Sequence, residues 1–295
     1  MKHLLLRYII LVPLLIGCAT YKAVKETSKT SIYGFEEIRK GMEWYRKGCY
    51  VKSVEHFFKA HEVFVSLDNI SGIAMTMNNI GNVYGKTGDT QSAILFLDES
   101  IELYDSLNDK KGLMQALSNK AAVLIDCRRL DEASKILNKV ESISKDNFFI
   151  PIFLNRGILF IKLKKFKEAE DVLIQALKNV NPIDNSEAAP INFALGNLMS
   201  ETNRYKEAIF YFKNALEADK KSEFYQGIAD DLSALGSVYI KQKNDKDAKL
   251  TLKRSAKLYS LIGNHNKANQ ILEQIKEDSP LTKYFINKAL ENPCK

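Results

Sequence analysis

With 295 residues, 45% of them hydrophobic and 27% charged, the chain has the composition of an ordinary globular protein, long enough for one solenoid or two small domains. Lysine and arginine total 43 against 36 acidic residues, and this mild excess is spread over many segments, which argues against a nucleic-acid surface. The sequence contains no serine-hydrolase elbow, zinc-protease motif or glycine-rich phosphate loop. We therefore predict a protein that is not an enzyme and that uses neither a cofactor nor a metal.

The N-terminus predicts an export signal. Lys2 supplies a positive start, and the apolar stretch from Tyr8 to Ile16 is too short for a transmembrane helix, which needs about 20 residues. Residues 15–18, Leu-Ile-Gly-Cys, resemble the lipobox of bacterial lipoproteins. An ordinary signal peptide with a chance cysteine is the alternative.

The lipobox resemblance implies that residues 1–17 are a signal peptide that is removed, and that Cys18 is the lipidation site, carrying acyl chains such as palmitate. Several acyl chains anchor a protein stably without spanning the membrane. Position 19 is alanine, whereas an aspartate after the lipidated cysteine would signal retention in the inner membrane. The resemblance therefore favours the outer membrane of the bacterial cell envelope, with the protein facing the periplasm. Residues 18–33 are polar, and we expect the lipidated cysteine to be followed by a flexible tether that reaches up to about 50 Å.

Residues 77–97 contain a pattern that the rest of the chain repeats. Apolar and small residues at helical spacing form one stripe as far as Tyr84, a break follows at Gly88, and a second stripe begins at Ala93. The pattern predicts two helices that form a hairpin. Small residues at Gly81 and Ala93 would let the two axes approach to about 8–10 Å.

This pattern recurs along the chain. Small residues occupy the equivalent position of the first helix at intervals of 36 to 40 residues, at Gly41, Gly81, Ala121, Gly157, Gly196 and Gly236. Twelve positions later, in the second helix, stand Ser53, Ala93, Ala133, Ala169, Ala208 and Ala248. The register resembles the tetratricopeptide repeat (TPR), whose usual period is about 34 residues. Its longer period here resembles a subclass of about 40 residues that contains peptide-binding regulators and cargo adaptors.

The TPR resemblance implies an all-α fold, a right-handed superhelix (an α-solenoid) of about six helical hairpins within residues 34–264. The repeats would start near residues 34, 74, 114, 150, 189 and 229, with Pro190 in the first turn of the fifth. Residues 265–295 lack the register. We expect them to form one or two capping helices, which cover the last apolar face, and a tail.

Function would then reside in the concave groove that the first helices of TPR hairpins line. The candidate groove residues are polar and lie opposite the packing stripe: Asn78, Asn79, Asn82, Lys86, Asn119, Asn155 and Asn197. Because an amide both donates and accepts, such a ladder could bind the backbone of an extended peptide, as the resemblance implies. The alternative is that these asparagines are simply polar residues on a wet helix face. Apolar residues expected to face the same groove are Met42, Tyr45, Ile125, Ile158, Ile161 and Phe193.

The resulting interpretation is a membrane-anchored scaffold that binds a peptide or protein segment, by analogy with TPR lipoproteins that assemble envelope machines. A peptide-responsive sensor is the second hypothesis. The sequence does not fix the oligomeric state.

Three cysteines follow the lipobox. Cys49 and Cys127 fall in the turns of the first and third hairpins, too far apart to pair with each other. We expect Cys294 in the tail to carry an unpaired thiol, and a disulfide to another molecule is the alternative.

Overall fold

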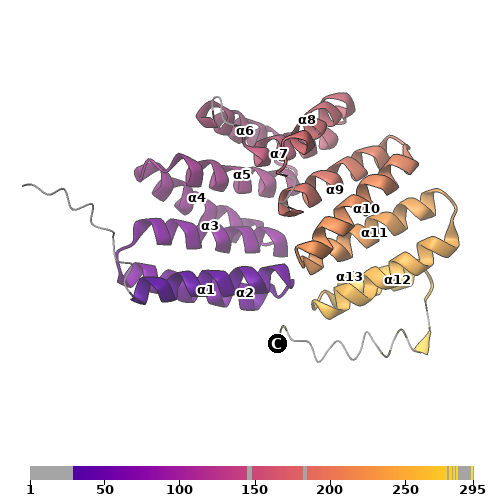
Figure 1. Ribbon diagram of the computed structural model, residues 1–295, viewed down its shortest axis with the longest axis horizontal. Helices are drawn as coiled ribbons and strands as arrows, with labels where there is room; N and C mark the ends of the chain where they lie inside the picture. Colours follow the sequence, from indigo (N-terminus) through magenta and orange to yellow (C-terminus); the bar gives the residue numbers. More distant parts are fainter. Residues whose placement is uncertain are drawn as a thin grey trace, which may run out of the picture.

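The computed structural model describes residues 29–144, 148–181 and 185–277, together with positions 279, 280, 282, 284 and 294. The predicted signal peptide and Cys18 lie outside these residues. Every regular element described is an α-helix, which confirms the all-α class (Figure 1). The helices are α1 Lys29–Arg46, α2 Tyr50–Ser66, α3 Ile70–Thr87, α4 Thr90–Ser106, α5 Lys110–Asp126, α6 Leu130–Ser144, α7 Ile150–Lys162, α8 Phe166–Lys178, α9 Asn185–Glu201, α10 Tyr205–Lys221, α11 Tyr225–Lys241, α12 Asp245–Leu261 and α13 His265–Gln274. None of them is both long enough and apolar enough to cross a membrane.

The helices pack as successive hairpins, each odd-numbered helix with the even-numbered helix that follows it. The ten connecting turns without masked residues share one geometry, because each contains one residue in the left-handed region, with φ between +49° and +86°. Glycine fills this position at Gly48, Gly88 and Gly263, where a positive φ costs least. Larger residues fill it at Asp68, Asn108, Arg128, Lys164, Asn203, Glu223 and Lys243.

The predicted small residues lie where the two helices of a hairpin cross. A Cβ atom added at Gly157 of α7 would collide with Leu173 of α8, which is fully buried. The same relation, a small residue against a large one sixteen positions later, holds for Gly41 with Phe57, Gly81 with Leu97, Gly196 with Phe212 and Gly236 with Leu252. The periodicity of the sequence thus records one repeated helix crossing.

The hairpins follow an arc, from α1 and α2 over α7 and α8 to α12 and α13 (Figure 1). Contacts join successive odd-numbered helices directly, α3 with α5, α5 with α7, α7 with α9 and α9 with α11. Within the described residues, no pair of successive even-numbered helices makes comparably extensive contact. Neighbouring hairpins approach most closely on the inside of a curve, so the odd-numbered helices line the concave face.

Two predicted boundaries differ from the structure. Residues 29–33 belong to α1 and not to the tether, because Ser31 is buried and Gly34 packs against the ring of Phe64. This first turn packs through small residues and carries no apolar stripe, so it could not be recognised as a helix. The fifth hairpin also begins earlier, at Asn185, and Pro190 lies inside α9. As the sixth residue of α9, Pro190 lies beyond the first turn in which it was predicted, so it removes one N–H from the hydrogen bonds within the helix.

Candidate functional site

The concave face holds the seven candidate groove residues on four odd-numbered helices. Asn78, Asn79, Asn82 and Lys86 lie on α3, Asn119 on α5, Asn155 on α7 and Asn197 on α9. Asn79, Asn82, Asn119 and Asn197 are half-buried, Lys86 is exposed, and Asn78 and Asn155 are buried. The sequence analysis placed all seven toward the groove that a ligand would meet, and the burial of Asn78 and Asn155 leaves little of these two amides open to a ligand.

The buried asparagines connect neighbouring hairpins. Asn119 donates from Nδ2 to Oδ1 of Asn78, at 2.9 Å, and accepts a hydrogen bond from Gln115 at 3.1 Å. Asn155 donates from Nδ2 to the backbone carbonyl of Ser118, at 2.8 Å. These amides therefore fix α3 to α5 and α5 to α7. A helical wheel treats each helix alone and could not reveal such bonds between helices.

We expect Asn155→Ala to lower the free energy of unfolding by about 1–2 kcal/mol, because it removes a buried hydrogen bond that joins α7 to the Ser118 carbonyl of α5. Asn197→Ala, at a half-buried position on α9, is the matched control, and we expect a change within about 0.5 kcal/mol. Urea unfolding followed by circular dichroism measures both. Equal stability of the two variants would show that the Asn155 bond contributes nothing.

Four residues from three helices meet on the concave face, and we call Tyr45, Asn82, Lys86 and Asp230 the interior cluster. Burial raises the pKa of Tyr45, although Lys86 and a hydrogen bond with Asn82 oppose the effect, so the phenol stays neutral. The electrostatic interaction with Tyr45 makes the largest contribution and raises the pKa of Lys86. Burial lowers this pKa, and Asp126 and Asp230 raise it further. Lys86 is thus a solvent-accessible cation facing groups from α1, α5 and α11.

The same cluster extends to the end of the chain. Asp230 accepts hydrogen bonds from the hydroxyl of Tyr259, from Lys267 Nζ at 2.9 Å and from Gln226 Nε2 at 3.0 Å. The hydroxyl of Tyr50 is buried close to Asp230 and has no hydrogen-bond partner among the described residues. Sequence reasoning missed Asp230 because no repeat pattern relates α11 to the turn between α1 and α2.

Two further aspartates lie beside the interior cluster, buried between α10 and α11. Burial, together with the neighbouring carboxylates, raises the pKa of Asp219 to about 7 and that of Asp231 to about 9. Neither oxygen of Asp231 meets a donor group among the described residues, apart from the carboxyl of Asp219. That contact is favourable only if the pair keeps a proton. The pair is therefore buried at the interface between the α9–α10 hairpin and the α11–α12 hairpin and is not exposed on the concave face.

The apolar groove residues divide in a similar way. Met42 is exposed, and Tyr45, Ile158, Ile161 and Phe193 are half-buried. Ile125 is fully buried against α6, so its predicted place in the groove is wrong. Within the described residues, no group of three or more His, Cys, Asp or Glu side chains is arranged to hold a metal ion.

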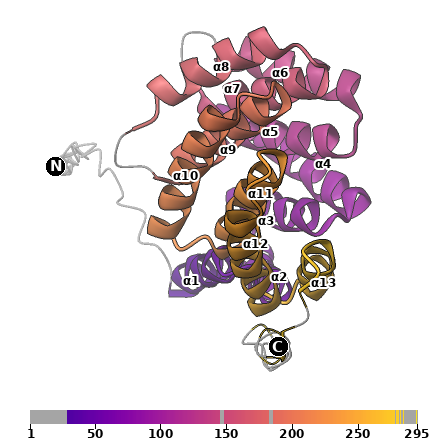
Figure 2. The same cartoon turned by 90° about the vertical axis from the view of Figure 1, so that its right-hand side faces the viewer.

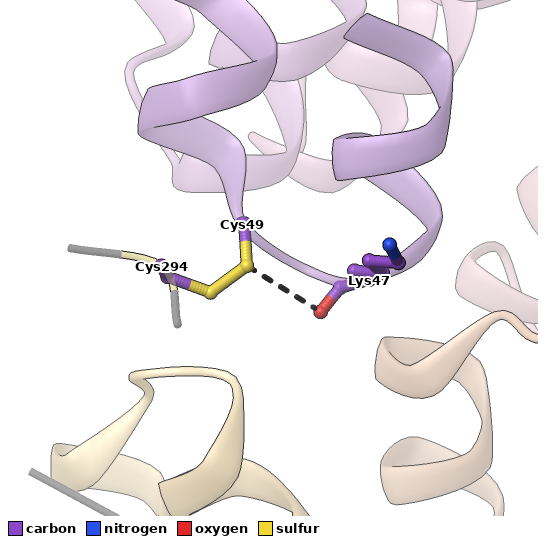
Figure 3. Close-up of a disulfide and its surroundings, with 3 residues drawn as sticks. All are labelled: Lys47, Cys49 and Cys294. Carbon is purple, nitrogen blue, oxygen red and sulfur yellow. Dashed lines mark hydrogen bonds between the residues drawn. A yellow bond between two sulfur atoms is a disulfide. The ribbon is translucent and has the colours of Figure 1, made fainter. Parts of the chain in front are cut away.

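The cysteines give the largest correction to the sequence analysis. Cys294 does not carry an unpaired thiol, because it forms a disulfide with Cys49, with the Cα atoms 5.0 Å apart (Figure 3). The two residues are separated by 245 positions. Cys127 is the free cysteine of the described residues. The pairing places Cys294 of the C-terminal segment at the turn between α1 and α2, which the spacing of the repeats alone did not reveal.

Two segments of the sequence match models of a known repeat family, in agreement with the repeated helix crossing. Residues 73–107, which contain α3 and α4, and residues 149–221, which contain α7 to α10, match models described as tetratricopeptide repeat. These two segments of the chain are therefore similar to tetratricopeptide repeats. No curated protein matches the sequence.

Solved structures resemble most of the helical array in fold. A Rap protein complexed with Competence and Sporulation Factor superposes with a TM-score of 0.59 at 13% identity, covering 88% of this chain and 77% of that one. The Rap conjugation gene regulator of plasmid pLS20, in complex with the Phr* peptide, gives 0.58 at 17% identity, covering 92% and 80%. A thermophilic TPR protein from Thermus thermophilus gives 0.52 at 19% identity, covering 68% and 98%. At these identities the resemblance is one of fold.

Proposed function

We propose that the protein is a non-enzymatic TPR scaffold that binds an extended peptide or protein segment on its concave face. The observation that carries the proposal is the row formed by Asn79, Asn82 and Lys86 on α3, which combines two half-buried amides with a solvent-accessible cation. Amides hydrogen-bond a peptide backbone, and a cation attracts an acidic side chain or a C-terminal carboxylate. Two solved structures with a similar fold, both Rap proteins, were determined as complexes, one of them with a peptide.

We further propose that the scaffold is anchored to a membrane through acylated Cys18 and serves the assembly of an envelope machine. Cys18 precedes the first described helix by only eleven residues, so the anchor would hold the array within about 40 Å of the lipid surface. The intrachain disulfide supports this location, because disulfides persist in oxidising compartments outside the cytosol.

The test is crosslinked co-purification from native membranes. The groove variant carries Asn79→Ala, Asn82→Ala and Lys86→Ala, and leaves Asn78, Asn119 and Asn155 in place because they hold the hairpins together. The matched control carries three substitutions on the even-numbered helices, Lys59→Ala, Glu99→Ala and Lys167→Ala. A third sample, Cys18→Ser, tests the anchor.

We expect the groove variant to lose one major partner that the control retains, and Cys18→Ser to leave the membrane fraction. Circular dichroism checks that all samples are equally folded. If the groove variant retains every partner, ligand binding on α3 is refuted. The lipoprotein proposal is refuted independently if the Cys18→Ser protein stays in the membrane fraction and the mass of the parent protein shows no acyl chains.

One observation favours the alternative function, a peptide-responsive sensor. The turn between α1 and α2 lies against Phe224 and Ile262 near the other end of the array, so a ligand that changes the curvature of the arc would make or break these contacts. If the peptide that binds the protein changes its radius of gyration in solution scattering, the sensor hypothesis is supported. If the radius is unchanged, the scaffold hypothesis is favoured.

A further inference from the structure

The first hairpin exposes apolar side chains at its open end, where α1 begins and α2 ends. The two helices run antiparallel, and Gly34 of α1 lies against the ring of Phe64 of α2. In this register residues 31–33 of α1 lie beside residues 65–67 of α2. The large apolar side chains at this end are between 37% and 53% exposed, and they are Ile32, Tyr33, Phe35, Val65 and Leu67.

These side chains are uncovered because no described hairpin precedes α1. Figure 2 shows α1 and α2 at one end of the arc, far from α6, α7 and α8. The repeat interval of 40 residues makes Gly72 of α3 and Gly112 of α5 equivalent to Ile32. A Cβ atom at Gly72 would collide with the ring of Phe64 in the preceding hairpin, and the same relation holds between Gly112 and Tyr104. At a position that the preceding hairpin covers in the next two repeats, α1 therefore carries a large exposed residue.

The same edge of the array continues at the next turn. Odd-numbered helices run in one direction and even-numbered helices in the other, so the turn between α4 and α5 lies on the edge where α1 begins. Leu107 in this turn is exposed. Exposed charges of both signs accompany these side chains, among them Lys29, Lys110 and Asp105. We call the following residues the apolar edge: Ile32, Tyr33, Phe35, Val65, Leu67 and Leu107.

We propose that the apolar edge rests on the lipid surface in which acylated Cys18 is anchored. This inference depends on the proposed acylation. Cys18 precedes Lys29, the first residue of α1, by eleven residues, a span of at most about 40 Å. The beginning of α1 is therefore the described part of the protein that lies nearest to the anchor along the chain, and the linkage gives it a high effective concentration at the bilayer.

The composition of the apolar edge fits the interface of a bilayer. Tyrosine is favoured at the level of the lipid headgroups, where Tyr33 would lie. Lysines such as Lys29 can keep their methylene groups in the lipid and extend the ammonium group into water. Because the exposed charges have both signs, the contact depends on burial of the apolar side chains more than on attraction to anionic lipid.

This contact would fix the orientation of the array. The first odd-numbered helices would begin at the lipid surface and run away from it. Lys86 lies near the far end of α3, about 24 Å from Ile70 along the helix axis at about 1.5 Å per residue. The part of the groove that contains Lys86 would therefore face the aqueous compartment, where a soluble partner can reach it.

The test is the depth of a fluorescent label in vesicles that carry the acylated full chain. Cys127→Ser removes the free thiol of the described residues, and either Leu67→Cys or Leu163→Cys then supplies one site for a nitrobenzoxadiazole label. Leu163, in the turn after α7, is the matched control, because it is similarly exposed but lies on the opposite edge. The vesicles contain phosphatidylethanolamine and phosphatidylglycerol, with or without bromine on the acyl chains.

We expect brominated lipid to quench the label on the Leu67→Cys protein at least about threefold more strongly than the label on the Leu163→Cys protein. Adding Ile32→Asp and Phe35→Asp should remove this difference, because a carboxylate is costly to bury in lipid. Both of these side chains are exposed, and circular dichroism checks that the helices remain folded. Mass spectrometry confirms the acyl chains of each sample.

Three outcomes would overturn the proposal, and they separate it from the proposed function. Equal quenching of the two labels on acylated protein refutes the lipid contact and leaves the anchor intact. If the label on the Leu67→Cys protein is shielded from iodide in solution but is not quenched by brominated lipid, the apolar edge is covered by another protein or by a second copy. A parent protein without acyl chains refutes the anchor and the lipid contact together.

Discussion

Replacing Phe212 with alanine is expected to lower the free energy of unfolding by about 3–5 kcal/mol, the range for a large aromatic side chain removed from a packed core. Phe212 of α10 is almost completely buried, its ring fills the space that Gly196 leaves on α9, and it packs edge-on against Phe193 at 5.5 Å between centroids. Its hydrophobic cluster also includes Leu232 and Leu235 of α11. The substitution thus weakens three consecutive helices at once.

The matched control is Phe210→Ala on the same helix, where the ring is 59% exposed. We expect it to change the stability by less than about 0.5 kcal/mol. Guanidinium unfolding, followed by helical circular dichroism, measures both variants. In a repeat protein the Phe212→Ala substitution should also split the unfolding transition into two steps, because the hairpins on either side of the weakened interface unfold less cooperatively. Equal losses for Phe210→Ala and Phe212→Ala would contradict this account of the α9–α11 packing.

Raising the pH from 5 to 8 is expected to destabilise the protein through Asp219 and Asp231. Burial raises both folded-state pKa values, to about 7 and about 9, above the ordinary aspartate value of 3.8. Near pH 5 each folded carboxyl holds a proton that the unfolded chain has released, and near pH 8 only Asp231 still holds one. Stability is then fully present below the unfolded pKa and is lost as the pH rises toward the folded pKa, with a slope of at most about 1.4 kcal/mol per pH unit for one proton.

The groups that face this pair are Asp230 on α11 and Tyr259 on α12, while Lys267 of α13 binds Asp230 and not the pair. The variant Asp231→Asn removes the proton and offers an N–H donor to Asp219. We expect its stability to change little between pH 5 and pH 8 and to exceed that of the parent at pH 8.

Thermal or urea unfolding at several pH values measures this dependence, with Asp171→Asn at an exposed site of α8 as the control. The control should retain the slope of the parent. An unchanged slope in Asp231→Asn would show that the buried pair does not titrate in the folded protein.

The helical hairpins could be predicted from the sequence because each is a local pattern. Gly157 and Leu173, sixteen residues apart, belong to one hairpin, so their spacing records a helix crossing that does not depend on the rest of the fold. The start of α1 could not be predicted in the same way, because Ser31 and Gly34 pack through their small size and produce no apolar stripe.

The candidate site was predicted less completely, because it depends on contacts between hairpins. Asn155 is polar and lies opposite the packing stripe, yet a carbonyl of the neighbouring hairpin takes its amide. The pairing of Cys49 with Cys294 and the approach of Asp230 to Lys86 depend on the total rotation accumulated over the whole array. A small error in the rotation of each hairpin, summed over the array, would move these groups far apart.

The left-handed turn residues give successive hairpins the same connection, from Gly48 through to Gly263. An open array built in this way can gain or lose whole repeats during evolution, because duplication or deletion of a unit leaves both ends intact. A closed array does not have that freedom. One hairpin more or fewer would carry Ile262 away from Gly48, so the contact between these two turns fixes the number of repeats in a gene whose individual repeats remain free to diverge.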